Sequence, residues 1–428
     1  MTEEDARESR GFARTLLALT LVGLAVRVAF LLLEPPARLA GDEPTWTTMA
    51  IQGLVHLRQP FSPLRSPIIF YPPGYPYFVG VFYALGGGLA AVKWAQVVVS
   101  ALLVPAVGRA GRTAFSAKVG LGAAALAAVY PELVWFSVHF WSETLFVTLL
   151  WWGFERALAA DASGRWPSAA GAGLLWGASA LTRETALGFV PFVAVWMLLS
   201  RGRAGRVRAA AFLLAAGLAV IPWTWRNWVA FDAFVPVSTF GAHALWQGNT
   251  SLPREEFYRQ TDAVEGAIPQ FRFARERGWE AIRERQPLWV IEKVRSEMPA
   301  LWGAETYVGL LLDDGAYAAG APAMRVVGHL SVVVYLAVLA AALPGLAILR
   351  LDRGPVLLVL FTACSLALHV ITFGDVRFRL PLMPLLFLAA AGAWCAWREG
   401  TFPRLGPTRR ALLAGLLLAA TVVVVSGR

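Results

Sequence analysis

The first long apolar stretch of the chain, TLLALTLVGLAVRVAFLLL at residues 15–33, contains one charged residue, Arg27. A run of about 20 such residues is long enough to cross a bilayer as a helix. Similar runs recur along the chain, which has 428 residues and is 57% hydrophobic but only 15% charged. Soluble domains have roughly 25% charged residues. The sequence therefore predicts an all-α polytopic membrane protein.

Hydropathy predicts about eleven transmembrane helices. They are expected at residues 15–33, 89–107, 119–136, 143–160, 168–181, 186–199, 209–223, 326–349, 356–373, 380–397 and 411–425. The short apolar segment 77–85 is expected to be a helix that lies at the membrane interface.

Three parts of the chain follow from these spans. Residues 1–225 form an N-terminal transmembrane catalytic module, which includes a first extracytoplasmic loop at 34–76. Residues 226–323 form a larger extracytoplasmic region, and 324–428 hold the C-terminal transmembrane helices. The mixed-charge N-terminus precedes an apolar run without a small-residue cleavage site, so the first helix is expected to be a retained anchor.

Arginine placement predicts the orientation. The loops GRAGRTAFSAK, SRGRAGRVR and REGTFPRLGPTRR fall on one side, which should be cytoplasmic and should include the N-terminus. The net charge of +10 is therefore no signal for nucleic acid. The polar clusters GDEP, TRET and GDVRFR all fall on the opposite, extracytoplasmic face. The two cysteines, Cys364 and Cys395, lie in apolar runs and have neither a disulfide pattern nor metal-ligand spacing.

Each polar cluster has a structural and a chemical interpretation. Asp42 and Glu43 could simply begin a helix with Pro44, or could accept a proton or bind a cation. Arg377 and Arg379 could reach lipid phosphates from the membrane edge, or could form a specific phosphate clamp.

Two further pairs are open in the same way. Arg183 and Glu184 could form a capping ion pair, or could face an interior cavity. His139 and Glu143 are four residues apart, which suits either a metal site or an ordinary helix start. A divalent cation is therefore left open as a cofactor. The sequence has no phosphate-binding loop, dinucleotide fingerprint or nucleophile elbow.

The ordered set of an acidic pair, YPPGYP, YPELVWFSVHFWSETLF, ALTRETAL and RFRLPLMPLLFLAAA resembles the C-type superfamily of membrane glycosyltransferases. The similarity extends from about residue 15 to 400 and is strongest to bacterial relatives of protein O-mannosyltransferases and of the lipid A aminoarabinose transferase.

The resemblance implies transfer of a sugar, with inversion, from a polyprenyl-phosphate donor to an extracytoplasmic acceptor, which could be a lipid, a glycan or a protein. It places the enzyme in the cytoplasmic membrane of a bacterium or archaeon. No insertion has the length of the lumenal domain of protein mannosyltransferases, which weighs against a protein acceptor.

The resemblance also assigns residues. It matches Asp42, with Glu43 beside it, to the catalytic acid of the first loop, and Arg377 and Arg379 to the residues that bind the lipid phosphate. Cavity or substrate candidates are Arg183, Glu184, His139, Glu143 and Tyr71. The chemistry of the residues agrees, because a base assists attack on the anomeric carbon and fixed positive charge assists departure of a phosphate. A transporter or flippase of lipid-linked sugars is the alternative, although the sequence shows no clear internal repeat.

Overall fold

The computed structural model describes residues 3–35, 37–58, 69–200, 202–317 and 321–426. Within these residues the chain is helical without strands, apart from one isolated bridge between Ala37 and Tyr317. The helices are α1 (Glu3–Leu33), α2 (Glu43–Arg58), α3 (Gly74–Ala84), α4 (Gly88–Ala101), α5 (Leu103–Ala114), α6 (Ala117–Val129), α7 (Pro131–Phe136), α8 (Glu143–Ser163), α9 (Trp166–Thr182), η3 (Glu184–Phe189), α10 (Val190–Leu198), α11 (Arg203–Phe231), α12 (Phe240–Gln247), α13 (Arg254–Asp262), α14 (Ala267–Glu284), α15 (Trp289–Trp302), α16 (Tyr307–Asp313), α17 (Pro322–Ile348), α18 (Arg353–Ile371), η4 (Val376–Leu382), α19 (Met383–Arg398) and α20 (Pro407–Ser426).

The predicted all-α polytopic membrane fold is confirmed. Six helical segments of the described chain are long and apolar enough to cross a membrane: 3–33, 88–114, 203–231, 322–348, 353–371 and 376–398. Shorter apolar helices, α6 and η3 with α10, accompany them. One predicted span, 119–136, is divided, because Pro131 lacks an amide hydrogen and begins the separate helix α7.

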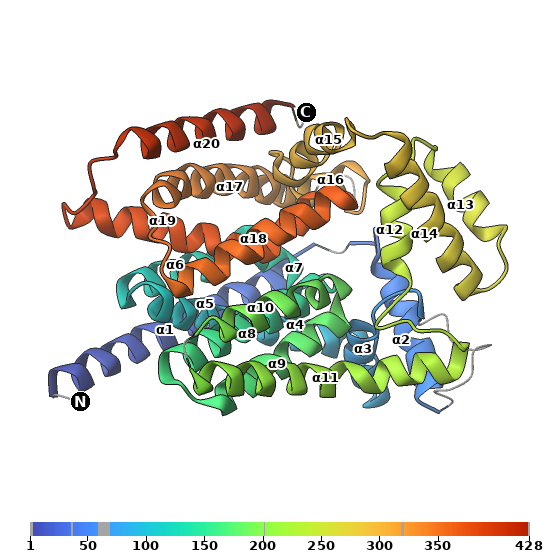
Figure 1. Ribbon diagram of the computed structural model, residues 1–428, viewed down its shortest axis with the longest axis horizontal. Helices are drawn as coiled ribbons and strands as arrows, with labels where there is room; N and C mark the ends of the chain where they lie inside the picture. The colour runs from blue at the N-terminus through green and yellow to red at the C-terminus, as the bar shows by residue number, and fades with distance from the viewer. Residues whose placement is uncertain (1–2, 36, 59–68, 201, 318–320, 427–428) are drawn as a thin grey trace.

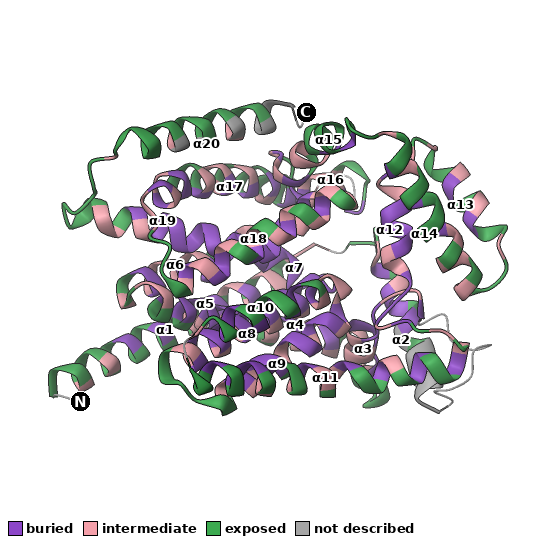
Figure 2. Cartoon of the chain, viewed as in Figure 1, coloured by how far each residue is buried: buried purple, intermediate pink, exposed green. Residues whose placement is uncertain are grey.

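The helices form one packed assembly. α8, α9 and α11 pack side by side, and α19 contacts both α6 and α17, which joins the C-terminal helices to the N-terminal ones (Figure 1). Small residues permit this packing: a Cβ on Gly173 of α9 would lie 2.1 Å from the carbonyl oxygen of Phe212 in α11. Burial is concentrated in α8, α9 and α19, whereas α20 and the start of α1 are largely exposed (Figure 2).

The region predicted to be extracytoplasmic consists of helices α12 to α16, which begin after α11 ends at Phe231. α12, α13 and α14 gather at one end of the molecule (Figure 1). Asn249 ties this group to the membrane helices, because its side-chain amide donates to the Ile371 carbonyl at 2.8 Å. Lys293 adds bonds to the Gly248 and Thr372 carbonyls. These contacts fix the segment between α18 and η4, the short helix that carries Arg377.

Candidate functional site

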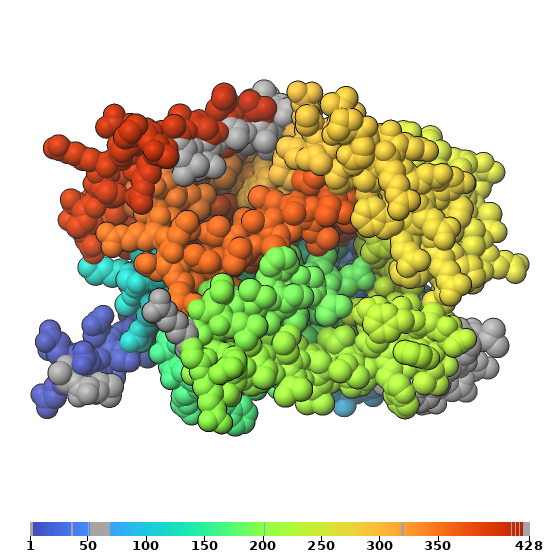
Figure 3. Space-filling model, in the orientation of Figure 1, coloured from blue at the N-terminus to red at the C-terminus, as the bar shows by residue number. Residues whose placement is uncertain are grey.

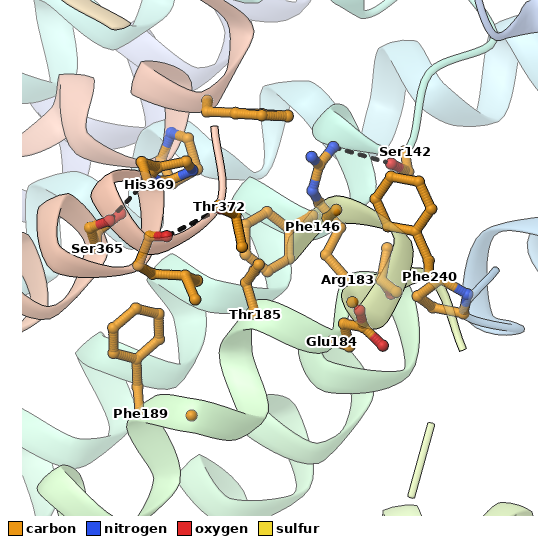
Figure 4. A pocket seen from close by; sticks show the side chains of 18 of the residues that line it. Ser142, Phe146, Arg183, Glu184, Thr185, Phe189, Phe240, Ser365, His369 and Thr372 are labelled. Atoms are coloured by element: carbon orange, nitrogen blue, oxygen red, sulfur yellow. Dashed lines mark hydrogen bonds between the residues drawn. The ribbon is translucent and has the colours of Figure 1, made fainter. Parts of the chain in front are cut away.

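A cavity of about 550 Å³ lies where the first loop, the α9–η3 turn, α12, α18 and η4 meet. Figure 4 shows Arg183, Glu184 and Phe240 on one side of it and Ser365, His369 and Thr372 on the other. Its polar lining residues include Asp42, Tyr71, Ser142, Glu143, Arg183, Glu184 and Arg377. Much of the remaining lining is apolar and comes from α8, η3, α10, α18 and η4.

Arg377 is the centre of the polar end. Its Nη1 donates to Asp42 Oδ2 at 2.6 Å, and its Nε lies 3.8 Å from Glu143 Oε1. Asp375 accepts a bond from the Arg377 amide at 3.0 Å and thereby fixes the start of η4. The guanidinium also lies over the Trp141 ring at 4.9 Å. Local capping and aromatic packing thus hold a largely buried cation against the first loop.

Arg183 provides the second cation of the site. It follows the last residue of α9 and donates to Glu143 Oε1 and, at 3.3 Å, to Ser142 Oγ. Arg183 and Arg377 share another neighbour, because each guanidinium lies 5.1 Å from the centre of the Phe378 ring. The cavity therefore has two arginines and two carboxylates, Asp42 and Glu143, within one network.

Glu184 and Tyr71 also line the cavity. Glu184 is not paired with its neighbour Arg183; it accepts a hydrogen bond from the Ser238 hydroxyl and so connects η3 to the segment before α12. The ring of Tyr71 stacks on Phe240 at 5.2 Å and packs against Trp46 at 5.1 Å. Burial and the nearby charge of Asp42 raise the pKa of the Tyr71 hydroxyl to about 12, so it is a neutral hydrogen-bonding group.

The structure separates Glu43 from Asp42. Glu43 is buried outside the cavity lining, where its carboxylate accepts bonds from the Ala40 and Phe140 amides at 3.0 and 2.9 Å. It also contacts His139 Nδ1 at 3.3 Å. Despite burial, which opposes the charged form, these hydrogen bonds lower the pKa of Glu43. The placement gives Glu43 the geometry of a group that anchors the first loop.

His139 is the partner in that anchor and does not line the cavity. Its Nε2 lies 2.7 Å from Glu34 Oε1 and 3.1 Å from the Tyr317 hydroxyl, and its ring stacks on Trp135 at 3.8 Å. The structure does not pair His139 with Glu143, which the sequence left open as metal ligands; Glu143 instead contacts Arg183 and Arg377.

Arg379 is also separated from its predicted partner, Arg377. It is fully buried outside the cavity lining, and its guanidinium donates to the Gly303 and Glu305 carbonyls at 2.6 and 2.7 Å. Glu132 lies 3.4 Å away and the Tyr335 ring 3.8 Å away. Protein groups therefore surround the guanidinium of Arg379. The structure does not place it where it could bind a phosphate in the cavity.

No group of three or more His, Cys, Asp or Glu side chains in the described part of the chain is arranged to hold a metal ion. Two of the acids that line the cavity, Asp42 and Glu143, are each paired with an arginine. A divalent cation stays a prediction, and no step of the chemistry below depends on one.

Several lining residues were not identified from the sequence. Trp46 and Phe240 resemble ordinary interfacial aromatics, and Ser365 and His369 lie within the apolar run of α18. A histidine inside a predicted membrane span is the one signal that could have marked this wall, because ionisable residues at that depth commonly face a cavity.

Comparisons with known proteins agree with this architecture. Residues 71–228 match the family model described as dolichyl-phosphate-mannose-protein mannosyltransferase. No curated protein matches the chain. The archaeal oligosaccharyltransferase AglB from Archaeoglobus fulgidus, solved with an inhibitory peptide and a dolichol-phosphate, aligns with a TM-score of 0.53 at 15% identity. That alignment covers 97% of this chain and 55% of AglB.

Two further solved structures are similar to the chain. The apo form of the same A. fulgidus oligosaccharyltransferase gives a TM-score of 0.55 at 14% identity, over 96% of this chain and 55% of that one. ArnT from Cupriavidus metallidurans, solved with bound undecaprenyl phosphate, gives a TM-score of 0.40 at 14% identity. That alignment covers 90% of this chain and 76% of ArnT. The chain thus spans about half the length of the oligosaccharyltransferase. The resemblance predicted from the motifs is confirmed: the chain shares its fold with the A. fulgidus oligosaccharyltransferase and, over residues 71–228, matches the family model described as dolichyl-phosphate-mannose-protein mannosyltransferase.

Proposed function

We propose that the protein transfers a sugar, with inversion, from a polyprenyl-phosphate donor to an acceptor on the extracytoplasmic face of a bacterial or archaeal cytoplasmic membrane. One observation carries the proposal: the Asp42 carboxylate and the Arg377 guanidinium meet at 2.6 Å at the polar end of a mainly apolar cavity. A base and a fixed cation are the two groups that the reaction needs.

The phosphate of the donor would lie against Arg377 and Arg183. Arg377 Nε is buried and has no hydrogen-bond partner among the described residues, so one donor of its fork is free. Guanidinium groups bind phosphate oxygens through such paired donors. Arg183 adds a second cation, which Ser142 and Glu143 hold in position.

The prenyl chain would lie between α10 and α18. Phe189 and Phe192 line the cavity from η3 and α10, and Phe361 and Leu368 line it from α18. In the space-filling view the orange surface of α18 lies against the green surface that includes α10 (Figure 3). Because lipid tails are as apolar as these side chains, the groove can receive the prenyl chain from the bilayer without a hydrophobic penalty.

The bonds, the electron pair and the proton of the transfer step can all be accounted for with these residues. The acceptor oxygen or nitrogen attacks the anomeric carbon, and the bond between that carbon and the phosphate oxygen breaks. The phosphate keeps the electron pair, and the acceptor's proton moves to Asp42. Protonation removes the negative charge of Asp42 and so weakens its attraction to Arg377. At the same time the leaving phosphate gains negative charge, so Arg377 interacts more strongly with the phosphate.

The arginine-rich loops support the proposed orientation, because such loops favour the cytoplasmic side and the site lies on the opposite face in the predicted topology. The A. fulgidus oligosaccharyltransferase, whose fold the chain shares, was solved with a dolichol-phosphate, which supports a polyprenyl-phosphate ligand of the same kind. The acceptor is a lipid, a glycan or a protein, and the proposal does not depend on which.

The test uses the purified full chain in lipid nanodiscs with radiolabelled polyprenyl-phosphate mannose or glucose. The membrane fraction of a deletion strain serves as the source of acceptor. We expect label to move to the acceptor and polyprenyl phosphate to be released. Absence of transfer with every donor, from a protein that is folded and binds none of these lipids, would contradict the proposal.

A further inference from the structure

His369, in the last turn of α18, lines the cavity and is mostly buried. Its Nδ1 lies 2.7 Å from the backbone oxygen of Ser365, one turn earlier (Figure 4). A carbonyl oxygen can only accept a hydrogen bond, so Nδ1 carries the proton. In the neutral ring, Nε2 then has a free lone pair. No partner for Nε2 is present among the described residues.

The ring is held close to the two arginines of the site. It stacks on Phe378, with ring centres 5.1 Å apart and planes at 28°. The guanidinium groups of Arg183 and Arg377 lie over the same phenylalanine ring. The His369 ring is therefore one aromatic side chain away from both arginines. With Nδ1 bonded to the Ser365 carbonyl, its Nε2 is a fixed hydrogen-bond acceptor close to the proposed phosphate position.

Building on the proposed function, we infer that His369 Nε2 accepts a hydrogen bond from a hydroxyl group of the donor sugar. The sugar is bonded directly to the phosphate, so its hydroxyls lie within a few ångströms of the arginines that hold it. The other two parts of the glycosylated lipid do not suit Nε2. The prenyl chain has no hydrogen-bond donor, and an ionised phosphate oxygen would place its own lone pair against that of Nε2. His369 is thus a residue that discriminates the glycosylated lipid from the bare carrier.

Two substitutions separate this role from a packing role. In His369→Asn the side-chain amide can keep the bond to Ser365 but has no atom at the position of Nε2, whereas in His369→Gln the amide oxygen can reach that position. We expect His369→Asn to bind the glycosylated lipid roughly three- to tenfold more weakly, as for loss of one neutral hydrogen bond. His369→Gln should retain most of the affinity.

The probes are undecaprenyl phosphate and the same lipid carrying mannose or glucose, whichever the wild-type protein binds more tightly. A matched control is His329→Asn, because His329 Nδ1 bonds the Arg325 carbonyl at 2.7 Å in the same way on an exposed face of α17. The inference requires that His369→Asn lose affinity for the glycosylated lipid only.

Equal losses for both lipids, or equal losses in the Asn and Gln variants, would show a packing role and overturn the inference. This outcome differs from failure of the proposed function, in which the wild-type protein itself binds neither lipid. A wild-type protein that binds the two lipids with equal affinity would also overturn the inference, since no sugar contact would then contribute to binding.

Discussion

Asp42 and Arg377 are 335 residues apart in the chain, yet a hydrogen bond of 2.6 Å joins the carboxylate of one to the guanidinium of the other. The contact brings the loop after the first membrane helix to the short helix η4, which directly precedes α19. It places a candidate base beside a candidate phosphate ligand, and it gives each of the two a separate, testable role.

Asp42→Asn should abolish most of the transfer but leave donor binding intact. The amide cannot accept a proton, and loss of a general base typically lowers the rate by about 10² to 10⁴. Binding should not weaken, because the change frees Arg377 from a competing carboxylate. Initial rates of transfer and lipid affinity are measured on the same preparation, with Glu276→Gln on the exposed surface of α14 as a control. A variant that transfers sugar at the wild-type rate would exclude Asp42 as the base.

Arg377→Gln should weaken binding of polyprenyl phosphate itself. A hydrogen bond to a charged group contributes about 1.5–3 kcal/mol, which corresponds to roughly a 10- to 150-fold change in affinity. The exposed Arg277, which pairs with Glu280 along its own helix, provides a charge-matched control as Arg277→Gln. Unchanged affinity in the Arg377 variant would show that the phosphate does not bind at Arg377.

Arg379 is expected to behave differently from Arg377, although the two are only two residues apart. Arg379→Met would leave Glu132 and two carbonyl groups buried without their cation, and breaking a buried pair typically costs about 3–5 kcal/mol. The thermal unfolding midpoint in detergent should fall, and Glu132→Gln in the same chain should restore part of it. If Arg379→Met instead kept its stability and lost lipid affinity, Arg379 would belong to the phosphate site.

The anchor between Glu43 and His139 predicts how stability varies with pH. Burial opposes the charged imidazole, but hydrogen bonds to Glu34 and Glu43 outweigh it and raise the pKa of His139 above its ordinary 6.5. The stabilisation is thus complete below about pH 6.5 and is lost as the pH rises through the higher folded-state pKa. The lowered pKa of Glu43 has the opposite sign: its contribution is lost as the pH falls through that value.

Unfolding midpoints measured from pH 4 to 9 test this account. His139→Gln should remove the decline on the alkaline side, while His329→Gln, whose ring is exposed, should retain it. An unchanged alkaline decline in His139→Gln would assign the effect to another group.

Hydropathy was sufficient to predict the all-α polytopic fold, because a membrane span is a property of a continuous segment. The meeting of GDEP, TRET and GDVRFR could also be predicted, since loops on one side of a membrane share a limited area. Which residue of each cluster faces the cavity could not be predicted. Asp42 lies in the cavity while Glu43, the next residue, is buried against Phe140, and no local pattern distinguishes them.

The same limit applies to the two arginines of GDVRFR. They lie in the tight helix η4, where residues two apart project in different directions, so Arg377 reaches the cavity and Arg379 reaches Gly303. Packing against α7, the end of α15 and α17 encloses Arg379 in protein. His369 was not predicted because its neighbours in α18 are apolar and its free nitrogen is defined by a single backbone contact.

The central claim is tested most directly by an electron cryo-microscopy map of the full chain in nanodiscs with bound polyprenyl phosphate. The account predicts phosphate density within hydrogen-bond distance of the Arg377 guanidinium, beside Asp42, with the prenyl chain between α10 and α18. A phosphate bound elsewhere, with the Arg377–Asp42 contact undisturbed and the groove between α10 and α18 empty of lipid, would contradict it.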